Sequence, residues 1–393
     1  MRVAVVAEYY PRRRDPASGI WAHRQALAAR AHGADVQVVV LERPLPPAAA
    51  LRAAARGRPG ALAAALKGAA AEPARDTIDG IPVEYARFVA PARRRAYASW
   101  HRWARLPLAR ALDRLHAEQP FDLVHAHYAL PAGGAAAPWA AAHGLPLVVS
   151  VHGGDLLGAP LQSPAARRTV SGVLRGAAAV MCNSRATLRR AAALAGAGDN
   201  MEVVHLGAAA PDPLPPRHAE PTVATLAHVD PRKRHVDVLR AVAQVPGLRW
   251  VVIGDGPELG PLRALARELQ VTDRVRFLGQ LDPDAALIEL ARCHAMALPS
   301  EDEAFGVAYA EALACGVPAI GCRGEGGPEE IAALGPGMLL VAPRDPGALA
   351  QTLREVTGHP GDLPDAARRT AAEHLSWDRC GRATVAVYGR AMR

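Results

Sequence analysis

Two carboxylates stand eight positions apart in the C-terminal half of the chain. In the stretch SEDEAFGVAYAEALACGVPAIG (300–321), Glu303 precedes a Phe-Gly pair and Glu311 lies beyond it. Residues 305–314 favour a helix, and the glycine and proline that follow suit its end. Free amides and the positive end of the helix dipole make such an N-terminus a ready anion site. Three amides would lie there, those of Phe305, Gly306 and Val307.

This arrangement suits a nucleoside diphosphate sugar. Gly306 has no side chain, so a phosphate could approach the backbone closely. Eight residues of continuous helix would span about 12 Å, comparable with the distance from a hexose to a ribose across a diphosphate. Glu303 would then accept sugar hydroxyls and Glu311 the ribose hydroxyls. Each also has a plainer explanation, Glu303 as an acid favoured by the helix dipole and Glu311 as a surface residue.

Short apolar runs alternate with helical patterns along the chain. They cover residues 3–7, 36–41, 121–127, 146–151, 178–182, 202–206, 222–227, 250–254, 274–279, 294–299, 317–321 and 338–341. Continuous apolar runs separated by helices predict parallel sheets that are covered on both faces. We therefore expect an α/β protein of two doubly wound domains that face a central cleft, with ligands at the carboxyl ends of the strands.

The domain boundary is predicted in PDPLPPRHAEP (211–221). A stretch so rich in proline can form neither a helix nor a central strand. We expect an N-terminal domain over residues 1–210, a linker over 211–221 and a C-terminal domain over 222–375. The length of 393 residues, half of them apolar, is enough for two such cores.

Composition narrows the classes of partner and compartment. The net charge of +8 favours anionic partners, but aromatic residues are only 4% and no nucleic-acid module is visible, so nucleic acid is the least favoured of them. The five cysteines are scattered, with no C-x-x-C pair, which indicates reduced core residues and no disulfide frame or metal site. Met1 leads directly into an apolar run, and no run reaches about 20 residues, so we expect a cytoplasmic protein without a signal peptide or membrane span.

Residues 87–118 interrupt the alternation with eight arginines against Asp113 and Glu118. Trp100 and Trp103, three positions apart, would share one face of a helix. One interpretation is a solvated arginine face over a core contact that the tryptophans anchor. The other is an acceptor-side surface that meets an anionic membrane or a lipid-diphosphate acceptor.

Other chemical patterns are weak. VVIGDGPELG (251–260) misses the spacing of a dinucleotide fingerprint by one residue, and we expect a tight turn after a strand, with the lining of the cleft as the other interpretation. No Ser-His-Asp order and no metal-ligand cluster is visible, which predicts metal independence. We expect His125 and His127, in one strand, to face opposite sides.

The E-x7-E block, with AFG after its first glutamate and EALACGVP from its second, resembles the signature of retaining GT-B glycosyltransferases of family 4. Further stretches follow in the order of that family: SGIWAHRQALAARAHGADVQVVV, HAHYALPAGGAAA, SVHGGDLL, TLAHVDPRKRHVDVLRA, VRFLGQL, EGGPEEI and SWDRC. The similarity covers nearly the whole chain apart from residues 44–120. It implies a GT-B fold of two Rossmann-like domains, with the final helix, 376–393, crossing back to the first.

The resemblance also implies roles for individual residues. Catalysis would fall to Glu303, Lys233 and His152, with Glu303 on the donor sugar, Lys233 on the diphosphate, and His152 facing the reacting sugar from the other domain. Donor contacts would come from Gly19, Asp155, His228, Arg232, Arg234, Leu278, Gly279, Gln280, Leu281, Phe305, Gly306, Val307 and Glu311. Residues 278–281 would meet the base through their backbone, and no cofactor is needed beyond the donor itself.

The implied reaction moves a hexose-type sugar from a nucleoside diphosphate sugar to an acceptor hydroxyl. UDP is favoured over GDP, and the acceptor, lipid-linked or a small molecule, would belong to polysaccharide, glycolipid or secondary-metabolite synthesis. The chain departs from the family at His228, where an arginine is usual, and Arg232 or Arg234 would compensate. Two alternatives stay open: an epimerase or phosphorylase of the same fold, and a non-catalytic protein that binds sugar nucleotides.

Overall fold

The structure, a computed structural model, describes residues 1–13, 15–44, 48–71, 73–158, 163–196 and 198–393. Its internal contacts divide the chain into two compact units. Unit 1 comprises Met1–Cys182, Leu188–Val204 and Gly381–Arg393, and unit 2 comprises Asn183–Thr187 and His205–Cys380. The proline-rich segment 211–221 therefore belongs to unit 2, and the residues from Gly381 onward return to unit 1.

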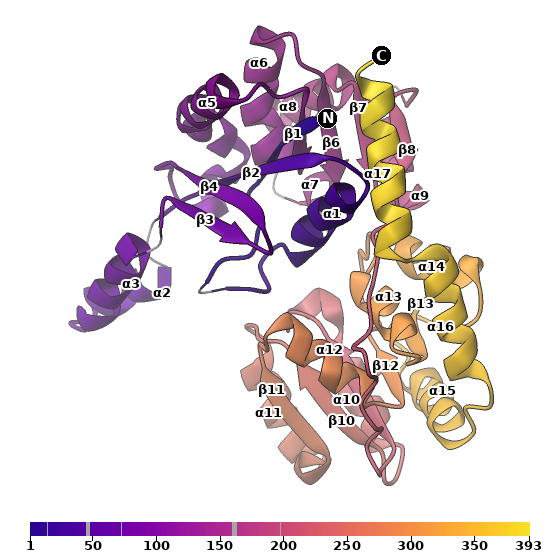
Figure 1. The fold of residues 1–393 in the computed structure, drawn as a ribbon. Helices are drawn as coiled ribbons and strands as arrows, with labels where there is room; N and C mark the ends of the chain where they lie inside the picture. Colours follow the sequence, from indigo (N-terminus) through magenta and orange to yellow (C-terminus); the bar gives the residue numbers. More distant parts are fainter. Residues whose placement is uncertain (14, 45–47, 72, 159–162, 197) are drawn as a thin grey trace. The chain divides into compact units, whose positions relative to one another are not determined.

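The described residues of unit 1 form an eight-stranded sheet with the order β3-β4-β2-β1-β5-β6-β7-β8 (Figure 1). Its strands are β1 (Arg2–Ala7), β2 (Asp35–Glu42), β3 (Arg75–Ile78), β4 (Ile81–Arg87), β5 (Leu123–His127), β6 (Leu147–Val151), β7 (Ala179–Cys182) and β8 (Met201–Val203). All neighbours pair in parallel except β3 and β4. The chain changes direction across the sheet between β1 and β5, which makes this the topological switch point.

The hairpin of β3 and β4 was not predicted. It lies in the segment 44–120, where neither strand is a continuous apolar run. The signal was the pair Asp79-Gly80, because both residues have positive φ (48° and 73°), as a two-residue hairpin turn requires. Ile78 and Ile81 pair across this turn and set the register.

Helices cover both faces of the sheet of unit 1, with two exceptions. The helix bounds are α1 (Ile20–Ala31), α2 (Ala48–Ala55), α3 (Gly60–Ala71), α4 (Arg93–Ala96), α5 (Trp100–Glu118), α6 (Gly134–Ala142), α7 (Gly154–Leu157), α8 (Pro164–Gly176), α9 (Arg185–Ala195) and α17 (Trp377–Ala391). The exceptions are α2 and α3, which pack against each other (Figure 1). On one face Val124 and Ala126 of β5 share a core cluster with Leu108 and Leu112 of α5.

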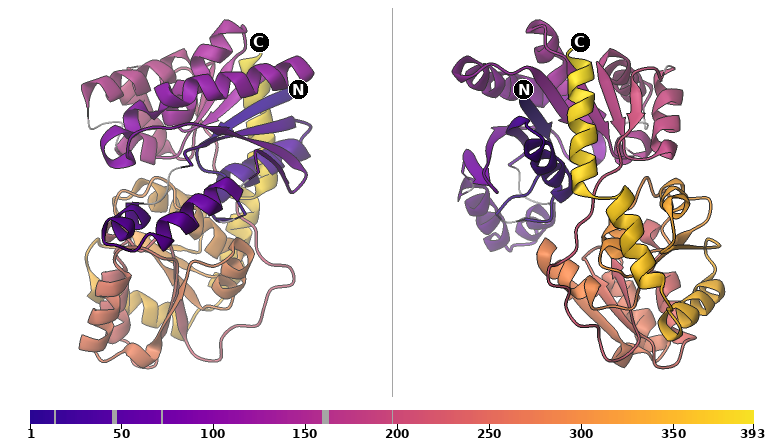
Figure 2. Two further views of the ribbon diagram at one scale, coloured as in Figure 1. Left: turned by 90° about the vertical axis from the view of Figure 1, so that its left-hand side faces the viewer. Right: turned by 45° about the vertical axis from the view of Figure 1, so that its right-hand side comes forward.

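The last helix, α17, packs on the other face beside α1. Both views of Figure 2 show it alongside the strands of unit 1. Gln25 of α1 donates a hydrogen bond to Thr384 of α17 over 3.0 Å. A Cβ on Gly381 would lie 2.4 Å from the carbonyl oxygen of Ala28, so only glycine permits this approach of the two helices.

Unit 2 has a six-stranded parallel sheet within its described residues, in the order β11-β10-β9-β12-β13-β14. Its strands are β9 (Thr222–Leu226), β10 (Arg249–Ile253), β11 (Val275–Gly279), β12 (Ala295–Ala297), β13 (Ala319–Cys322) and β14 (Met338–Val341). Its helices are α10 (His235–Ala243), α11 (Leu259–Glu268), α12 (Pro283–Ala291), α13 (Val307–Ala314), α14 (Gly326–Leu334), α15 (Pro346–Gly358) and α16 (Leu363–His374). The switch point lies between β9 and β12.

Helix α5 carries residues 100–118 of the arginine-rich segment, and its two tryptophans differ in burial. Trp100 is only 5% exposed and packs against Phe88 and Tyr97. Trp103 is 51% exposed, although it lies three positions later. The expectation that both anchor the core is therefore wrong for Trp103, because the helix turns this position out of the interface that buries Trp100.

The structure also bears on two predictions from the sequence, which concern the state of the cysteines and the absence of a membrane-spanning helix. All five cysteines, each within the described residues, are buried and form no disulfide. In the part of the chain that the structure describes, no helix combines the length and the apolar character needed to cross a membrane.

Candidate functional site

The predicted site residues of unit 2 gather at the carboxyl edge of its parallel sheet. Lys233 follows β9, and Glu303 follows β12, so the two flank the switch point where ligands bind in such sheets. Asp230 positions Lys233, since its carboxylate accepts from the amides of Arg232 and Lys233 over 2.9 and 3.2 Å. Asp followed by proline is a strong start for such a turn.

Lys233 and Glu303 form an ion pair, with Nζ 2.6 Å from Oε2. The hydroxyl of Ser300 donates to the same oxygen over 2.8 Å. Both charged side chains are largely shielded from solvent. Among the described residues no group bonds to Oε1 of Glu303, so this oxygen can accept a hydroxyl from a ligand.

The backbone around Glu303 is fixed from two sides. Its amide donates to Glu325 Oε2 over 2.8 Å, and its carbonyl accepts from the amide of Gly327 over 3.2 Å. Tyr309, which is fully buried, donates its hydroxyl to the carbonyl of Leu298 and lies 3.2 Å from Ser300 Oγ. The carboxylate of Glu303 is thus held by a network that reaches into the core.

Helix α13 begins at Val307, not at Phe305, which corrects the expected start by two residues. Gly306 is its N-cap with φ 81° and ψ 72°, a conformation that ends any regular continuation toward Phe305. Phe305 itself is buried. Within the described residues no acceptor takes the amides of Phe305, Gly306 and Val307, the three expected donors, and the amide of Ala308 likewise has none.

Glu311 lies half-buried on the second turn of α13. Because the helix starts at Val307, only part of the segment from Glu303 to Glu311 is helical. The span of continuous helix assumed for this pair is therefore wrong, and the pair's separation follows from the loop before Gly306 as well as from the helix.

Three further cations were expected near the diphosphate. His228, after β9, is exposed. Arg234 is held by Asp237 over 2.8 and 3.0 Å and lies 3.9 Å from Glu301, so its charge is already matched. The side chain of Arg232 is exposed, and its guanidinium lies 3.5 Å from the carboxylate of Asp230. Of the two candidate replacements for the usual arginine, Arg232 is the one that a phosphate could recruit without breaking a close pair.

The expected base contacts lie at the end of β11. Leu278, Gly279 and Leu281 are half-buried, and Gln280 is exposed. The carbonyl of Gly279 already accepts from the amide of Gly254 over 2.8 Å, which ties this end to β10. The glycine pair of VVIGDGPELG thus closes a turn against neighbouring backbone, as expected for a tight turn after a strand.

In unit 1, Gly19 is the N-cap of α1 with φ 64°. A Cβ there would lie 2.2 Å from the carbonyl carbon and oxygen of Tyr9, so glycine is required for the chain to pass Tyr9. Glycine is therefore needed at position 19 for steric reasons alone. The approach of a phosphate to Gly19 stays a prediction.

His152 follows β6 and belongs to a cluster of histidines. Its Nε2 lies 3.0 Å from Nδ1 of His127, with the two rings stacked at 14°. The rings of His127 and His125 lie 4.5 Å apart, so the expectation of opposite sides was wrong, since strand side chains two positions apart point the same way. Burial lowers the pKa of His125 and His152 to about 3, which makes both neutral imidazoles at neutral pH.

The C-terminal helix anchors this cluster. Tyr388 Oη lies 2.8 Å from His125 Nδ1, and Ser150 Oγ lies 2.8 Å from His125 Nε2. His125 is thereby fixed at both ring nitrogens. The arrangement places His127 directly behind His152, where it can orient the ring that the resemblance assigns to the reacting sugar.

Asp155 supports the loop that carries His152. Its carboxylate accepts from the amides of Ala129, His152 and Gly153, each over 3.1 Å. The side chain is 1% exposed, and burial raises its pKa to about 6 despite these bonds. With both oxygens occupied by backbone, Asp155 serves the loop, whereas the sequence had placed it on the donor.

Reasoning from the sequence missed Ser300, Tyr309, Glu325 and His127. Ser300 carried a signal, because it lies three positions before Glu303 and directly after an apolar run. Tyr309 carried none, since a tyrosine on the apolar face of a helix is indistinguishable from ordinary core. Across the described ranges, no three His, Cys, Asp or Glu side chains gather as a metal site, and metal independence stays a prediction.

Two family models match the chain almost end to end. Residues 18–207 match the model of a glycosyl transferase 4-like domain, and residues 209–374 match the model of glycosyl transferases group 1. The first match ends at residue 207 and the second begins at residue 209, just before the proline-rich segment 211–221.

Curated relatives match over shorter stretches. N-acetyl-alpha-D-glucosaminyl L-malate synthase of Bacillus anthracis is 44% identical over 102 residues, which are 25% of this chain and 26% of that protein. D-inositol 3-phosphate glycosyltransferase of Mycolicibacterium smegmatis is 35% identical over 179 residues, 43% of this chain and 40% of that protein. The matched stretch therefore spans less than half the length of either relative.

Solved structures match over the full length at low identity. HepE of Anabaena in complex with UDP and glucose has a TM-score of 0.72 and 19% identity, with 98% of this chain and 99% of that one covered. Sucrose-phosphate synthase of Thermosynechococcus elongatus has a TM-score of 0.75 and 19% identity, with 99% and 98% covered. The two mostly parallel sheets and these likenesses show the GT-B fold.

Proposed function

Because this chain belongs to the glycosyl transferases of group 1, we propose that it transfers a hexose-type sugar from a nucleoside diphosphate sugar to an acceptor hydroxyl, with retention at the anomeric carbon. The observation that carries the proposal is the pair of Lys233 and Glu303 beside the amides at the start of α13. A cation, a carboxylate with one oxygen available and three amide donors match a sugar diphosphate group by group.

The proposed donor lies along this row. The diphosphate binds the amides of Gly306 and Val307 and the ammonium of Lys233, and the exposed Arg232 adds a second charge. Glu303 accepts sugar hydroxyls at Oε1 while Lys233 and Ser300 hold Oε2. Two further parts of the proposal are carried over from the resemblance: Glu311 binds the ribose, and residues 278–281 meet the base.

We favour UDP as the nucleotide. HepE, which shares the fold, was crystallised with UDP and with UDP-glucose. Because backbone atoms of residues 278–281 would make the base contacts, GDP is the alternative that experiment must compare.

The proposed chemistry breaks the bond between the anomeric carbon and the diphosphate oxygen and forms a bond from that carbon to the acceptor oxygen on the same face. The acceptor proton passes to the departing phosphate oxygen, so no covalent glycosyl-enzyme forms. Lys233 and the α13 amides stabilise the charge that develops on the diphosphate, which is commonly the largest catalytic contribution. From the resemblance we add His152 as a contact of the reacting sugar; burial lowers its pKa and keeps the imidazole neutral, and His127 orients the ring.

For the acceptor we propose a lipid-linked or small-molecule hydroxyl, with contact to an anionic membrane through residues 87–118. The exposed Trp103 and the exposed arginines of α5 support a membrane contact.

The proposal is tested by ligand-dependent stability and by turnover. Thermal-shift measurements with UDP, GDP and their sugars should single out one nucleotide, and a ligand at 100 times its dissociation constant adds about 2.7 kcal/mol of stability. Release of nucleoside diphosphate should then require both the matched donor and an acceptor.

A matched pair of variants tests the role of Glu303. Glu303→Gln should abolish turnover, whereas Glu301→Gln, in the same loop but paired with Arg344 over 2.6 Å, should retain it. Full activity of Glu303→Gln would contradict the assignment. Binding of the sugar nucleotide without turnover across many acceptors would instead favour a non-catalytic binding protein.

A further inference from the structure

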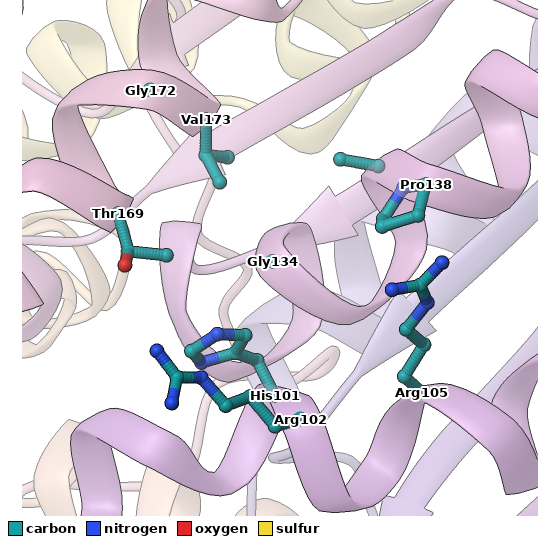
Figure 3. A pocket seen from close by; sticks show the side chains of 9 residues that line it. His101, Arg102, Arg105, Gly134, Pro138, Thr169, Gly172 and Val173 are labelled. Atoms are coloured by element: carbon teal, nitrogen blue, oxygen red, sulfur yellow. The ribbon is translucent and has the colours of Figure 1, made fainter.

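A cavity of about 520 Å³ lies in unit 1 between α5, α6 and α8. Its volume falls within the range of small-molecule sites, roughly 300–1,000 Å³. Figure 3 shows His101, Arg102 and Arg105 of α5 along one side, with Pro138 of α6 and Thr169 and Val173 of α8 around the rest. The proposed donor site does not involve this cavity, and the proposed membrane contact concerns only the segment 87–118, to which His101, Arg102 and Arg105 belong.

The histidine and the two arginines that line the cavity all come from α5. His101 donates from Nδ1 to the carbonyl of Ala98 over 2.9 Å, which fixes the ring. In the part of the chain that the structure describes, neither Arg102 nor Arg105 forms an ion pair with a carboxylate. Both are exposed on the rim. The rim therefore carries uncompensated positive charge and suits an anion.

The rest of the lining is apolar or lacks a side chain. Val173, Pro138 and Ala137 provide carbon surface, and Thr169 turns its hydroxyl to the carbonyl of Ala165 over 3.0 Å. A Cβ on Gly172 would meet no atom within 4 Å, so the cavity is open above this residue. A ligand that fills the space would bury a hydrocarbon part there while its charge stays at the rim.

The surface of α5 beside the rim also combines apolar side chains with arginines. Trp103 is 51% exposed and Leu106 is 57% exposed, and both lie on α5 next to the rim arginines. Tryptophan and leucine among arginines are typical of a helix that lies at a membrane interface.

We propose that the cavity binds one anionic lipid, with the phosphate between Arg102 and Arg105 and the first part of the hydrocarbon chain among α6 and α8. Trp103 and Leu106 then enter the interfacial layer of the membrane from which the lipid comes. The inference rests on the proposed membrane contact of residues 87–118, but not on the transfer reaction.

The first test uses soluble octyl phosphate and isothermal titration calorimetry. The 393-residue chain should bind octyl phosphate at least about tenfold more tightly than inorganic phosphate, because only the former buries hydrocarbon. Arg105→Gln should weaken binding about tenfold, the usual effect of losing one charged hydrogen bond. Arg110→Gln removes the same charge from an exposed position of α5 outside the lining and should leave the affinity within about twofold.

The second test fills the cavity. Gly172→Leu places a side chain in the open space, and leucine favours a helix more than glycine, so the variant should fold. Gly176→Leu makes the same change one turn later on α8, where a Cβ also meets no atom and no cavity wall lies. Gly172→Leu should lose octyl phosphate binding, and Gly176→Leu should keep it.

Co-sedimentation with vesicles separates the lipid from a free phosphate. Wild type and Gly176→Leu should bind vesicles of phosphatidylcholine with phosphatidylglycerol, and neither should bind phosphatidylcholine alone. Gly172→Leu should bind the anionic vesicles at least about fivefold more weakly. Equal affinity for inorganic and octyl phosphate, equal losses in Arg105→Gln and Arg110→Gln, or unchanged vesicle binding by Gly172→Leu would each overturn the proposal. None of these assays uses a donor, so failure of the transferase proposal would leave their outcome intact.

Discussion

Replacement of Gly306 by alanine perturbs the start of α13 at its tightest contact. A Cβ at this position would lie 2.3 and 2.4 Å from two ring carbons of Tyr309. The ring of Tyr309 is fully buried, and its hydroxyl is bonded to Leu298 and Ser300, so it cannot move aside freely. The helix start, or the network that holds Glu303, must therefore shift.

Two costs add up in this variant. Alanine at φ 81° costs about 1 kcal/mol, because its Cβ crowds the following carbonyl. Overpacking against the ring costs about 1–3 kcal/mol. The expected loss in the free energy of unfolding of unit 2 is therefore about 3 kcal/mol.

Gly324 offers a matched control. It has the same φ of 81°, but a Cβ there would meet no atom within 4 Å. Gly324→Ala should cost about 1 kcal/mol, the backbone contribution alone. The difference of about 2 kcal/mol between the two variants isolates the contact with Tyr309.

Hydrogen exchange measures this difference within unit 2, which is preferable because two units need not unfold together. The slowest amides of β9 and β12, at the centre of the sheet, report the unfolding of the whole unit. They should exchange about fivefold faster in Gly324→Ala and about a hundredfold faster in Gly306→Ala. UDP affinity should fall in Gly306→Ala with the displaced amides. Equal acceleration in both variants would refute the packing of Tyr309 against the helix start.

Three further outcomes are expected. Lys233→Met should weaken UDP binding in calorimetry at least about tenfold, as the loss of one charged contact does, and an unchanged affinity would remove Lys233 from the diphosphate site. Burial raises the pKa of Asp155 from 3.8 to about 6, so the folded state binds the proton of this carboxyl more tightly than the unfolded state does. This proton stabilises the fold below about pH 4, and the stabilisation is lost as the pH rises through 6. Between pH 4 and 8 the free energy of unfolding of wild type should fall by up to about 3 kcal/mol more than that of Asp155→Asn, and parallel pH profiles would contradict this. His127→Phe should lower kcat about tenfold with KM unchanged. His127→Asn keeps a polar atom near the position of Nδ1 and should restore part of the lost kcat, whereas an equal loss of kcat in both variants would indicate a purely structural role for His127.

Local patterns in the sequence were enough for the strands and for the edge at which the site lies. The continuous apolar runs became the parallel strands β1, β2 and β5 to β14, because a strand buried on both faces needs an apolar residue at nearly every position. The hairpin of β3 and β4 escaped the same criterion. β3 is the edge strand of the sheet and tolerates polar residues, and β4, between β3 and β2, carries Pro82 and Glu84 within its apolar residues. Its turn signal, Asp79-Gly80, was available and unused.

Which residue types stand at the carboxyl ends of the strands can be inferred from short stretches, because backbone sterics and periodicity act over a few neighbouring residues. Which of these residues meet depends on the fold of the whole chain. Lys233 joins Glu303 across 70 residues, and Tyr388 joins His125 across 263. Asp155 turns out to hold a loop because its oxygens happen to face three amides in the folded chain. Such contacts follow from strand order, register and side-chain packing, which sum many small energies over the whole domain and leave no mark on any short stretch.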